Sequence, residues 1–366
     1  MKKIVFAILF INQLCLANDS IQISILTCSP GQEVYSLFGH SSIRILDRTN
    51  QNDLVYNFGM FDFDTPNFSY KFVKGKLRYF LGVQKTNDFI ESYTLEGRTV
   101  SEQTLLLAEI EKKQLLDTLH FLHKPENRFY YYSFLQKDCS TELRDLLVHV
   151  GVDFRKKELQ ESYRQMIASF LENKQWLRLG VNMVLGKSLD ENANTYTSMF
   201  LPNNLEREVS FSTINRKAIV KSTQLLNAIP IYYNPRFEFQ ITPLFMFSVL
   251  SIILIFWLPK PLKLLICYAV GLIGLTIVFL ILFSEHPEFK YNYNFLWCNP
   301  LYLLYIPSFI KNRARRILTL ILTTCLTASI FIWIFKIQQF DIATIPIILI
   351  LASINFREQK KLVSVV

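Results

Sequence analysis

Residues 264–283 read LLICYAVGLIGLTIVFLILF and contain no charged side chain. Because a helix rises about 1.5 Å per residue, a run of this length can cross the hydrocarbon core of a bilayer. Similar apolar runs lie on either side of it, and two of them are short and interrupted by prolines. The C-terminal part of the chain therefore predicts an all-α membrane bundle of about five spans, at residues 242–258, 264–283, 295–310, 317–335 and 342–356.

The basic residues around these runs are distributed unevenly. If the preceding part of the chain lies outside the membrane, nine Lys and Arg residues fall in cytoplasmic segments and two fall in outer loops. This distribution favours five spans with a cytoplasmic C-terminus. It also explains much of the formal net charge of +9, and because no nucleic-acid-binding motif accompanies that charge, we expect no nucleic-acid partner. The inner residues are Lys260, Lys263, Lys311, Arg313, Arg315, Arg316, Arg357, Lys360 and Lys361, and the outer ones are Lys290 and Lys336.

The N-terminus has the three parts of a secretory signal peptide. Lys2 and Lys3 precede a short apolar run at residues 4–11, and Ala17 offers a small residue for cleavage. The run is short for a spanning anchor, and the residues before Cys15 are not the small apolar set of a lipid-attachment site. We predict a signal peptide at 1–17, an extracytoplasmic domain at 18–240 and a multi-pass membrane domain at 241–366.

The predicted extracytoplasmic domain mixes strands and helices. Apolar and polar residues alternate in its strand candidates, whereas apolar residues recur every three or four positions in its helix candidates. Asp138 is a suitable N-cap for one of the helices, and Gly151 is a suitable end for it. The pattern predicts an α+β domain with five or six short strands. Strands are predicted at 22–27, 54–61, 99–107 and 129–134, a turn leads into another near His40, helices are predicted at 109–122, 138–151 and 162–185, and 187–229 has no clear period.

Cys139 is the strongest candidate for chemistry. It opens a predicted helix, where the helix dipole and free backbone N–H groups favour a thiolate and can hold an oxyanion. A thiol nucleophile also needs a base, and His40 fits best because it begins a predicted strand beside Gly39. Asn57, on the next predicted strand, is the first candidate for orienting the imidazole, ahead of Asp62 and Asp64.

The remaining cysteine and histidine residues have other interpretations. His120 and His123 share a helix face at metal-ligand spacing, but the sequence offers no matching third ligand. We therefore favour two residues on a helix surface over a metal site. His149 lies too far along the predicted helix to reach Cys139. In an oxidising compartment Cys28 and Cys139 are free to form a disulfide, which is the alternative to a catalytic Cys139.

Several strings occur together in an order that resembles the Lnb family of bacterial lipoprotein N-acyltransferases. The resemblance implies a permuted papain-like, NlpC-like thiol domain followed by membrane helices, with His40 and Cys139 as the catalytic pair. The chain departs from the expected pattern at Asp138, where an amide residue is expected. The strings are LTCSPG at 26–31, YSLFGHSSIR at 35–44, YNFGMFDF at 56–63, FVKGKL at 72–77, RTVSEQ at 98–103, PENR at 125–128, DCST at 138–141 and NPL at 299–301.

This resemblance implies acyl transfer within the membrane. The Cys139 thiol would take an acyl chain from a membrane phospholipid and pass it to the α-amine of the diacylglyceryl-cysteine at the N-terminus of a bacterial lipoprotein. The resemblance also implies a multi-pass bundle in the bacterial inner membrane, with the thiol domain in the periplasm. The bundle would hold the site at the surface of the lipid bilayer, and no cofactor or metal is expected. Two other functions use the same residues: a membrane-anchored NlpC-like cysteine peptidase or amidase acting on cell-wall peptide, and a receptor with a structural Cys28–Cys139 disulfide.

Overall fold

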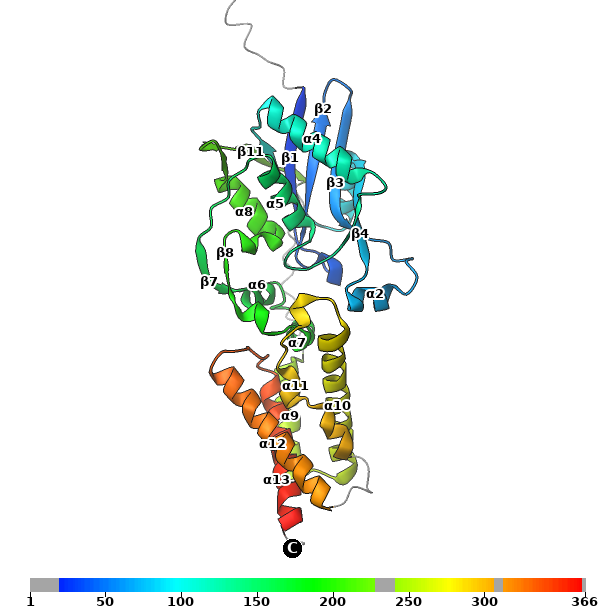
Figure 1. Cartoon of the computed structure of the whole chain (residues 1–366), viewed down its shortest axis with the longest axis vertical. Helices are drawn as coiled ribbons and strands as arrows, with labels where there is room; N and C mark the ends of the chain where they lie inside the picture. Colours follow the sequence, from blue (N-terminus) through cyan, green and yellow to red (C-terminus); the bar gives the residue numbers. More distant parts are fainter. Residues whose placement is uncertain (1–19, 228–240, 306–311, 364–366) are drawn as a thin grey trace, which may run out of the picture.

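The computed structural model describes residues 20–227, 241–305 and 312–363. Figure 1 shows an elongated molecule in which a domain built on a β-sheet stands on one end of a bundle of helices. The predicted signal peptide at 1–17 lies outside the described residues. The predicted fold class is confirmed in outline, as a sheet-rich mixed α/β domain followed by a helical C-terminal region.

The N-terminal domain is built on a seven-stranded sheet in the order β11-β5-β1-β2-β3-β4-β6, and every neighbouring pair is antiparallel. The register of the central strands pairs Cys28 with His40 and Ile43 with Tyr56, so the start of β2 lies beside the end of β1. The strands are β1 (Ile21–Cys28), β2 (His40–Asp47), β3 (Asn52–Met60), β4 (Arg78–Lys85), β5 (Val100–Leu105), β6 (Phe129–Tyr131) and β11 (Val220–Asn227), and the short pairs are β7 (Glu158–Ser162) with β8 (Asn192–Asn194) and β9 (Thr213–Ile214) with β10 (Lys217–Ala218).

Helices cover both faces of this sheet. On one face Ile25 and Ile43 pack with leucines of α4, α5 and α8, whereas on the other Leu26 and Val55 pack with Phe89 of α3. The alternation of the strands sends successive residues to these two layers. The helices are η1 (Val34–Ser36), α2 (Phe68–Lys74), α3 (Thr86–Leu95), α4 (Glu109–His123), α5 (Cys139–His149), α6 (Tyr163–Ser169), α7 (Gln175–Val184), η2 (Lys187–Asp190), η3 (Thr197–Phe200) and α8 (Pro202–Phe211).

The sequence predicted the central strands and α4 and α5, but it missed elements at the edges. Strand β11 is largely exposed, so it shows no buried-and-exposed alternation, and residues 187–229 also contain α8. The single helix predicted at 162–185 is two helices, α6 and α7, separated at residues 170–174. The count of five or six strands was therefore too low for this domain.

The C-terminal bundle contains helices of very different length. By length and composition, the segments Lys260–Phe283 and Arg313–Ile334 are able to cross a membrane, and α9 is a shorter apolar helix. The elements are α9 (Pro243–Phe256), α10 (Lys260–Phe283), η4 (Pro287–Phe289), α11 (Asn294–Trp297), η5 (Pro300–Tyr305), α12 (Asn312–Ile334) and α13 (Thr344–Val363).

The third predicted span, 295–310, is not one continuous helix over its described residues. Helix α11 ends at Trp297 and η5 begins at Pro300, because proline has no backbone N–H and disfavours helical geometry in the residue before it. The broken segment packs closely on α10, where a Cβ added at Gly274 would collide with the carbonyl of Cys298. Small residues permit such close packing in membranes. Residues 306–310 lie outside the described part, and the count of five crossings stays a prediction.

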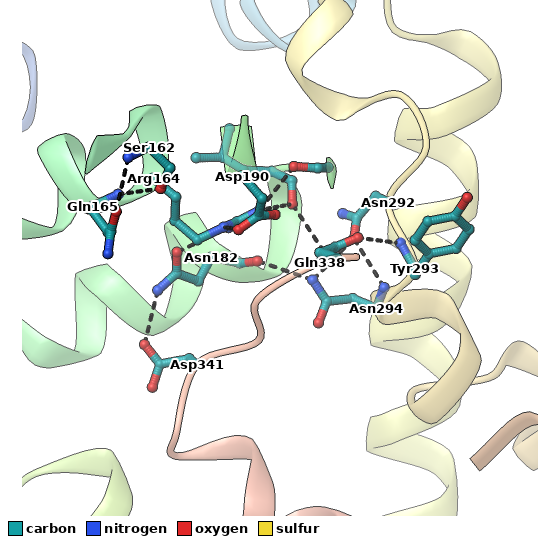
Figure 2. A network of polar contacts seen from close by, with 12 residues as sticks. Ser162, Arg164, Gln165, Asn182, Asp190, Asn292, Tyr293, Asn294, Gln338 and Asp341 are labelled. Carbon is teal, nitrogen blue, oxygen red and sulfur yellow. Dashed lines mark hydrogen bonds and ion pairs between the residues drawn. The ribbon is translucent and has the colours of Figure 1, made fainter. Parts of the chain in front are cut away.

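A buried polar network fastens the N-terminal domain to the bundle (Figure 2). Asn182 of α7 donates from Nδ2 to Asp341 of the α12–α13 loop at 3.0 Å, and its Oδ1 accepts from Arg164 at 3.1 Å. Arg164 also pairs with Asp190 at 2.8 Å, and Arg178 pairs with Asp341 at 3.2 Å. Side chains of α6 and α7 thus connect the domain to the end of the bundle.

Gln338 extends this network to the α10–α11 loop. Its Oε1 accepts from the backbone N–H of Tyr293 at 2.7 Å, and its Nε2 donates to Asn292 at 3.2 Å (Figure 2). Asn294 donates in turn to the backbone carbonyl of Asn182 at 3.0 Å. Buried polar groups are costly when unpaired, so this network specifies one position of the domain on the bundle.

Replacing Asp341 by alanine is expected to loosen this attachment. The change leaves Arg178 and Asn182 without a buried acceptor and costs roughly 3 kcal/mol of stability. Asp117→Ala is the control, because Asp117 forms an exposed pair with Lys113 on α4 and should cost less than about 1 kcal/mol. Thermal unfolding of the full chain in detergent micelles measures both. Equal midpoints for the two variants would contradict a structural role for the network.

Candidate active site

Cys139 is the first residue of α5, as predicted. The Asp138 side chain caps this helix by accepting hydrogen bonds from the backbone N–H groups of Ser140 at 2.9 Å and Thr141 at 2.8 Å. Thr141 Oγ1 accepts from the backbone N–H of Asp138 at 2.8 Å, which completes a reciprocal capping box. The cap holds the Cys139 thiol at a defined point where α5 meets the sheet.

His40 and Asn57 are hydrogen bonded across the ends of β2 and β3. His40 Nε2 lies 3.2 Å from Asn57 Oδ1. Because an amide oxygen only accepts hydrogen bonds, Nε2 carries the proton and Nδ1 is the basic nitrogen of the neutral ring. The ring of Tyr93 lies nearly parallel to the imidazole, with centroids 6.4 Å apart, and limits its orientation from α3.

Cys139 meets the sheet at Ser41 and Gly59. The backbone N–H of Ser41, the residue after His40, faces the sulfur, and the hydroxyl groups of Ser41 and Ser140 are 3.0 Å apart. Gly59 has a φ of +85°, and a Cβ there would lie 3.6 Å from the Cβ of Cys139. The described residues include no direct hydrogen bond between Cys139 and His40; the contact of Cys139 with this part of β2 is made by Ser41.

Burial keeps both reactive groups neutral. Desolvation raises the pKa of the Cys139 thiol more than the nearby N–H groups of Ser41 and Ser140 lower it. Desolvation also lowers the pKa of His40 to about 4, although its hydrogen bond to Asn57 acts in the opposite direction. The thiolate expected from the helix dipole is therefore wrong for the resting site, where the cost of burying a charge is larger.

Cys28 and Cys139 are both free cysteines, so the disulfide considered from the sequence is absent. Cys28 is fully buried and lies opposite His40 in the β1–β2 register, whereas Cys139 is partly exposed. Burial raises the pKa of the Cys28 thiol strongly. Of these two thiols, only Cys139 is accessible to a substrate.

The other candidates from the sequence lie elsewhere. Asp62 accepts from the backbone N–H of Asp64 at 2.9 Å in an exposed turn after β3, so these residues form a turn. Among the described residues, no group of three or more His, Cys, Asp or Glu side chains is arranged to hold a metal ion. His120 is exposed on α4, whereas the partly buried ring of His123 lies edge-on to the core residue Tyr56, with centroids 6.2 Å apart. The sequence missed Ser41 and Tyr93, because only strand pairing and helix packing bring them to the site.

Gly39 positions His40 by a close backbone approach. Its φ is +86°, and a Cβ would lie 2.6 Å from the carbonyl oxygen of Cys28. Gly39→Ala is therefore expected to lower stability more than the matched change Gly97→Ala. Gly97 also has a positive φ, +68°, but it has open space around it. Strain alone costs about 1–2 kcal/mol in both variants, and the collision adds to it only at Gly39. Thermal midpoints in detergent compare them, and equal losses would show that the collision is relieved without cost.

The fold and the site define a membrane protein whose N-terminal α/β domain carries a partly exposed cysteine beside a histidine–asparagine pair. Residues 15–169 match the Lnb N-terminal periplasmic domain, and residues 234–357 match the Lnb transmembrane domain. The two matches cover most of the chain, and the chain belongs to the Lnb family. Its N-terminal domain is accordingly periplasmic. No curated protein and no solved structure matches the chain.

Proposed function

We propose that the protein is a lipoprotein N-acyltransferase that moves an acyl chain from a membrane phospholipid to the N-terminus of a lipoprotein. Membership of the Lnb family supports an acyltransferase type of membrane protein. The observation that carries the proposal is the position of Cys139 against Ser41 and Gly59, on the two strands that carry the hydrogen-bonded His40–Asn57 pair. A permuted papain-like arrangement is the proposed relationship of this site to known thiol enzymes.

The first half-reaction forms a thioester on Cys139. His40 Nδ1 accepts the thiol proton while the sulfur attacks the carbonyl carbon of a phospholipid ester. The S–C bond forms, the ester C–O bond breaks, and His40 returns the proton to the oxygen of the leaving lysophospholipid. Neutral partners suit this step, because a buried thiol and a buried imidazole exchange one proton without a net change in charge.

The second half-reaction moves the acyl chain to the lipoprotein. The free α-amine of the diacylglyceryl-cysteine attacks the thioester, the N–C bond forms and the S–C bond breaks. His40 takes a proton from the amine and returns it to the Cys139 sulfur. The N–H groups of Ser41 and Cys139 are the proposed donors to the oxyanion in both steps, since they already face the sulfur.

The same proposal assigns a topology to the chain. The signal peptide ends at residue 17, the periplasmic domain runs from 18 to 240, and the membrane domain from 241 to 366 crosses the bilayer five times. The C-terminus is then cytoplasmic, in agreement with the excess of Lys and Arg in the inner segments. This topology places the thiol above the outer leaflet of the inner membrane, where both lipid substrates occur.

Mass spectrometry of lipoprotein N-terminal peptides tests the activity. Cells lacking this protein and any redundant enzyme are complemented with the wild type, Cys139→Ala or His40→Ala. The proposal predicts an N-acylated terminus with the wild type alone. A terminus that stays unacylated in every strain would overturn it, and release of cell-wall peptide by purified protein would then establish the peptidase or amidase alternative.

A further inference from the structure

Helix α2 exposes an unusual number of apolar side chains. None of its residues is buried, although its sequence FSYKFVK is rich in aromatic groups. Tyr70 is 60% exposed and Phe72 45%, and Phe63 in the preceding turn is 64% exposed. Exposed apolar patches mark surfaces that contact a partner or a membrane.

Helix α2 is held against the periplasmic end of α10. Ser284 Oγ donates to the backbone carbonyl of Val73 at 2.7 Å, and the N–H of Glu285 donates to the carbonyl of Lys74 at 2.9 Å. His286 Nε2 donates to the carbonyl of Phe72 at 2.8 Å. Figure 1 shows α2 beside the end of α10 that faces the sheet domain. The aromatic helix therefore lies at the level where an apolar spanning helix ends.

The exposed surfaces of α2 and α10 are continuous. Phe279 and Phe283, in the last turns of α10, are 45% and 55% exposed. A cavity of about 190 Å³ separates the two helices, and it is lined by Tyr70, Val73, Lys74, Phe279, Phe283 and Ser284. Helix α10 is long and apolar enough to cross a membrane, and lipid around its end would then also contact the exposed side of α2.

A row of aromatic rings leads from α2 to the neighbourhood of the thiol. Its last member, Tyr132, stacks on Tyr79, and Tyr79 also contacts Tyr130, which packs against the same core cluster as Cys139. Aromatic faces of this kind pack well against acyl chains and the ester region of lipids. The ring centroids are 6.4 Å apart for Phe72–Phe68, 5.8 Å for Phe68–Phe61, 5.2 Å for Phe61–Tyr79 and 4.6 Å for Tyr79–Tyr132.

The charge of α2 selects among membrane lipids. Lys71 and Lys74 lie in its last turn, and Lys74 lines the cavity beside α10. Cations at this depth attract a phosphate group. A glycerophospholipid carries such a group, whereas a diacylglyceryl-cysteine does not. The site therefore fits the acyl donor better than the acyl acceptor.

We propose that α2, Phe63 and the last turns of α10 form the entry site for a glycerophospholipid of the outer leaflet. The aromatic row then guides its acyl ester toward Cys139. This inference rests on the proposed acyl transfer, for which it names the donor site.

Photo-crosslinking tests the lipid contact without requiring activity. A benzoylphenylalanine is placed at residue 63, 72 or 110 of the full chain carrying Cys139→Ala, in vesicles that contain labelled phosphatidylglycerol. Ile110 is the control, because it is 77% exposed but lies on α4, at the end of the domain away from the bundle (Figure 1). We expect labelling at 63 and 72 to exceed that at 110 by about tenfold. Equal labelling at all three positions would overturn the site.

A second measurement separates this site from the proposed function. Thioester formation on Cys139 is compared between a phosphatidylglycerol vesicle and a short water-soluble ester. In Phe63→Ser/Phe72→Ser the ratio of the two rates should fall about tenfold, since each lost ring removes apolar contact with lipid. Ile110→Ser should leave the ratio unchanged. An unchanged ratio in the double variant would overturn the entry site but not the enzymatic function. If lipid crosslinks at residues 63 and 72 but the wild type forms no thioester, the enzymatic function is overturned and the entry site is not.

Discussion

Acyl transfer by the Cys139→Ala variant is expected to be at least about 10⁴-fold slower than by the wild type. No other thiol of the described periplasmic residues can replace it, because Cys28 is fully buried. Alanine keeps the helix cap, since Asp138 accepts from the backbone N–H groups of Ser140 and Thr141 rather than from the thiol. The loss is measured as the rate of N-acylation of a diacylglyceryl peptide in mixed micelles.

Cys28→Ala is the matched control for this variant. It removes the thiol that lies opposite His40 in the β1–β2 register, but it leaves the nucleophile Cys139 in place. We expect it to lower stability through a small buried cavity while it keeps the thioester intermediate. Thioester on wild-type and Cys28→Ala protein, with none on Cys139→Ala, would establish the nucleophile. A thioester on Cys139→Ala would exclude it.

The second large effect is expected for His40→Ala, which should slow acyl transfer by about 10²–10⁴-fold. The imidazole is the only group at the site that accepts the thiol proton in the proposed mechanism. Because burial lowers the pKa of His40 to about 4, its basic form persists well below neutral pH. The wild-type value of kcat/KM should therefore fall on the acidic side near pH 4 rather than near 6.5, in a series of buffers of constant ionic strength.

Asn57→Asp supplies the test of this assignment. A carboxylate in place of the amide would favour the imidazolium and raise the pKa of His40. The acidic limb of kcat/KM should then move to higher pH, whereas a merely structural change would lower the rate without moving the limb. A wild-type limb near pH 6.5, or a limb that does not move in Asn57→Asp, would contradict the proposed base.

The features that the sequence predicts well are those that depend on neighbouring residues. The apolar run at 264–283 has the length and composition of a spanning helix, and it forms α10. Asp138 lies three residues before Thr141, which is the spacing of a capping box, so the start of α5 at Cys139 was predictable. The break before Pro300 is local as well, because it follows from proline, whereas the close approach of this segment to Gly274 depends on distant packing and was not predictable.

The protonation state of the site also depends on tertiary structure. The position of Cys139 in a helix is local, and from it alone the dipole predicts a thiolate. The opposite result arises because the thiol packs against Ser41 of β2 and Gly59 of β3, and burial there raises its pKa. A sequence contains no direct measure of desolvation, since burial is produced by elements far apart in the chain.

By itself, the sequence determined that this protein joins a mixed α/β domain to membrane helices, and that Cys139 opens a helix in that domain. These properties follow from run length, periodicity and capping, which act over a few residues. Only the tertiary structure decided that His40 bonds to Asn57, that Cys28 is buried and unpaired, and that α2 lies at the end of α10. Strand register and packing between domains decided these contacts, because they join residues as far apart as Val73 and Ser284.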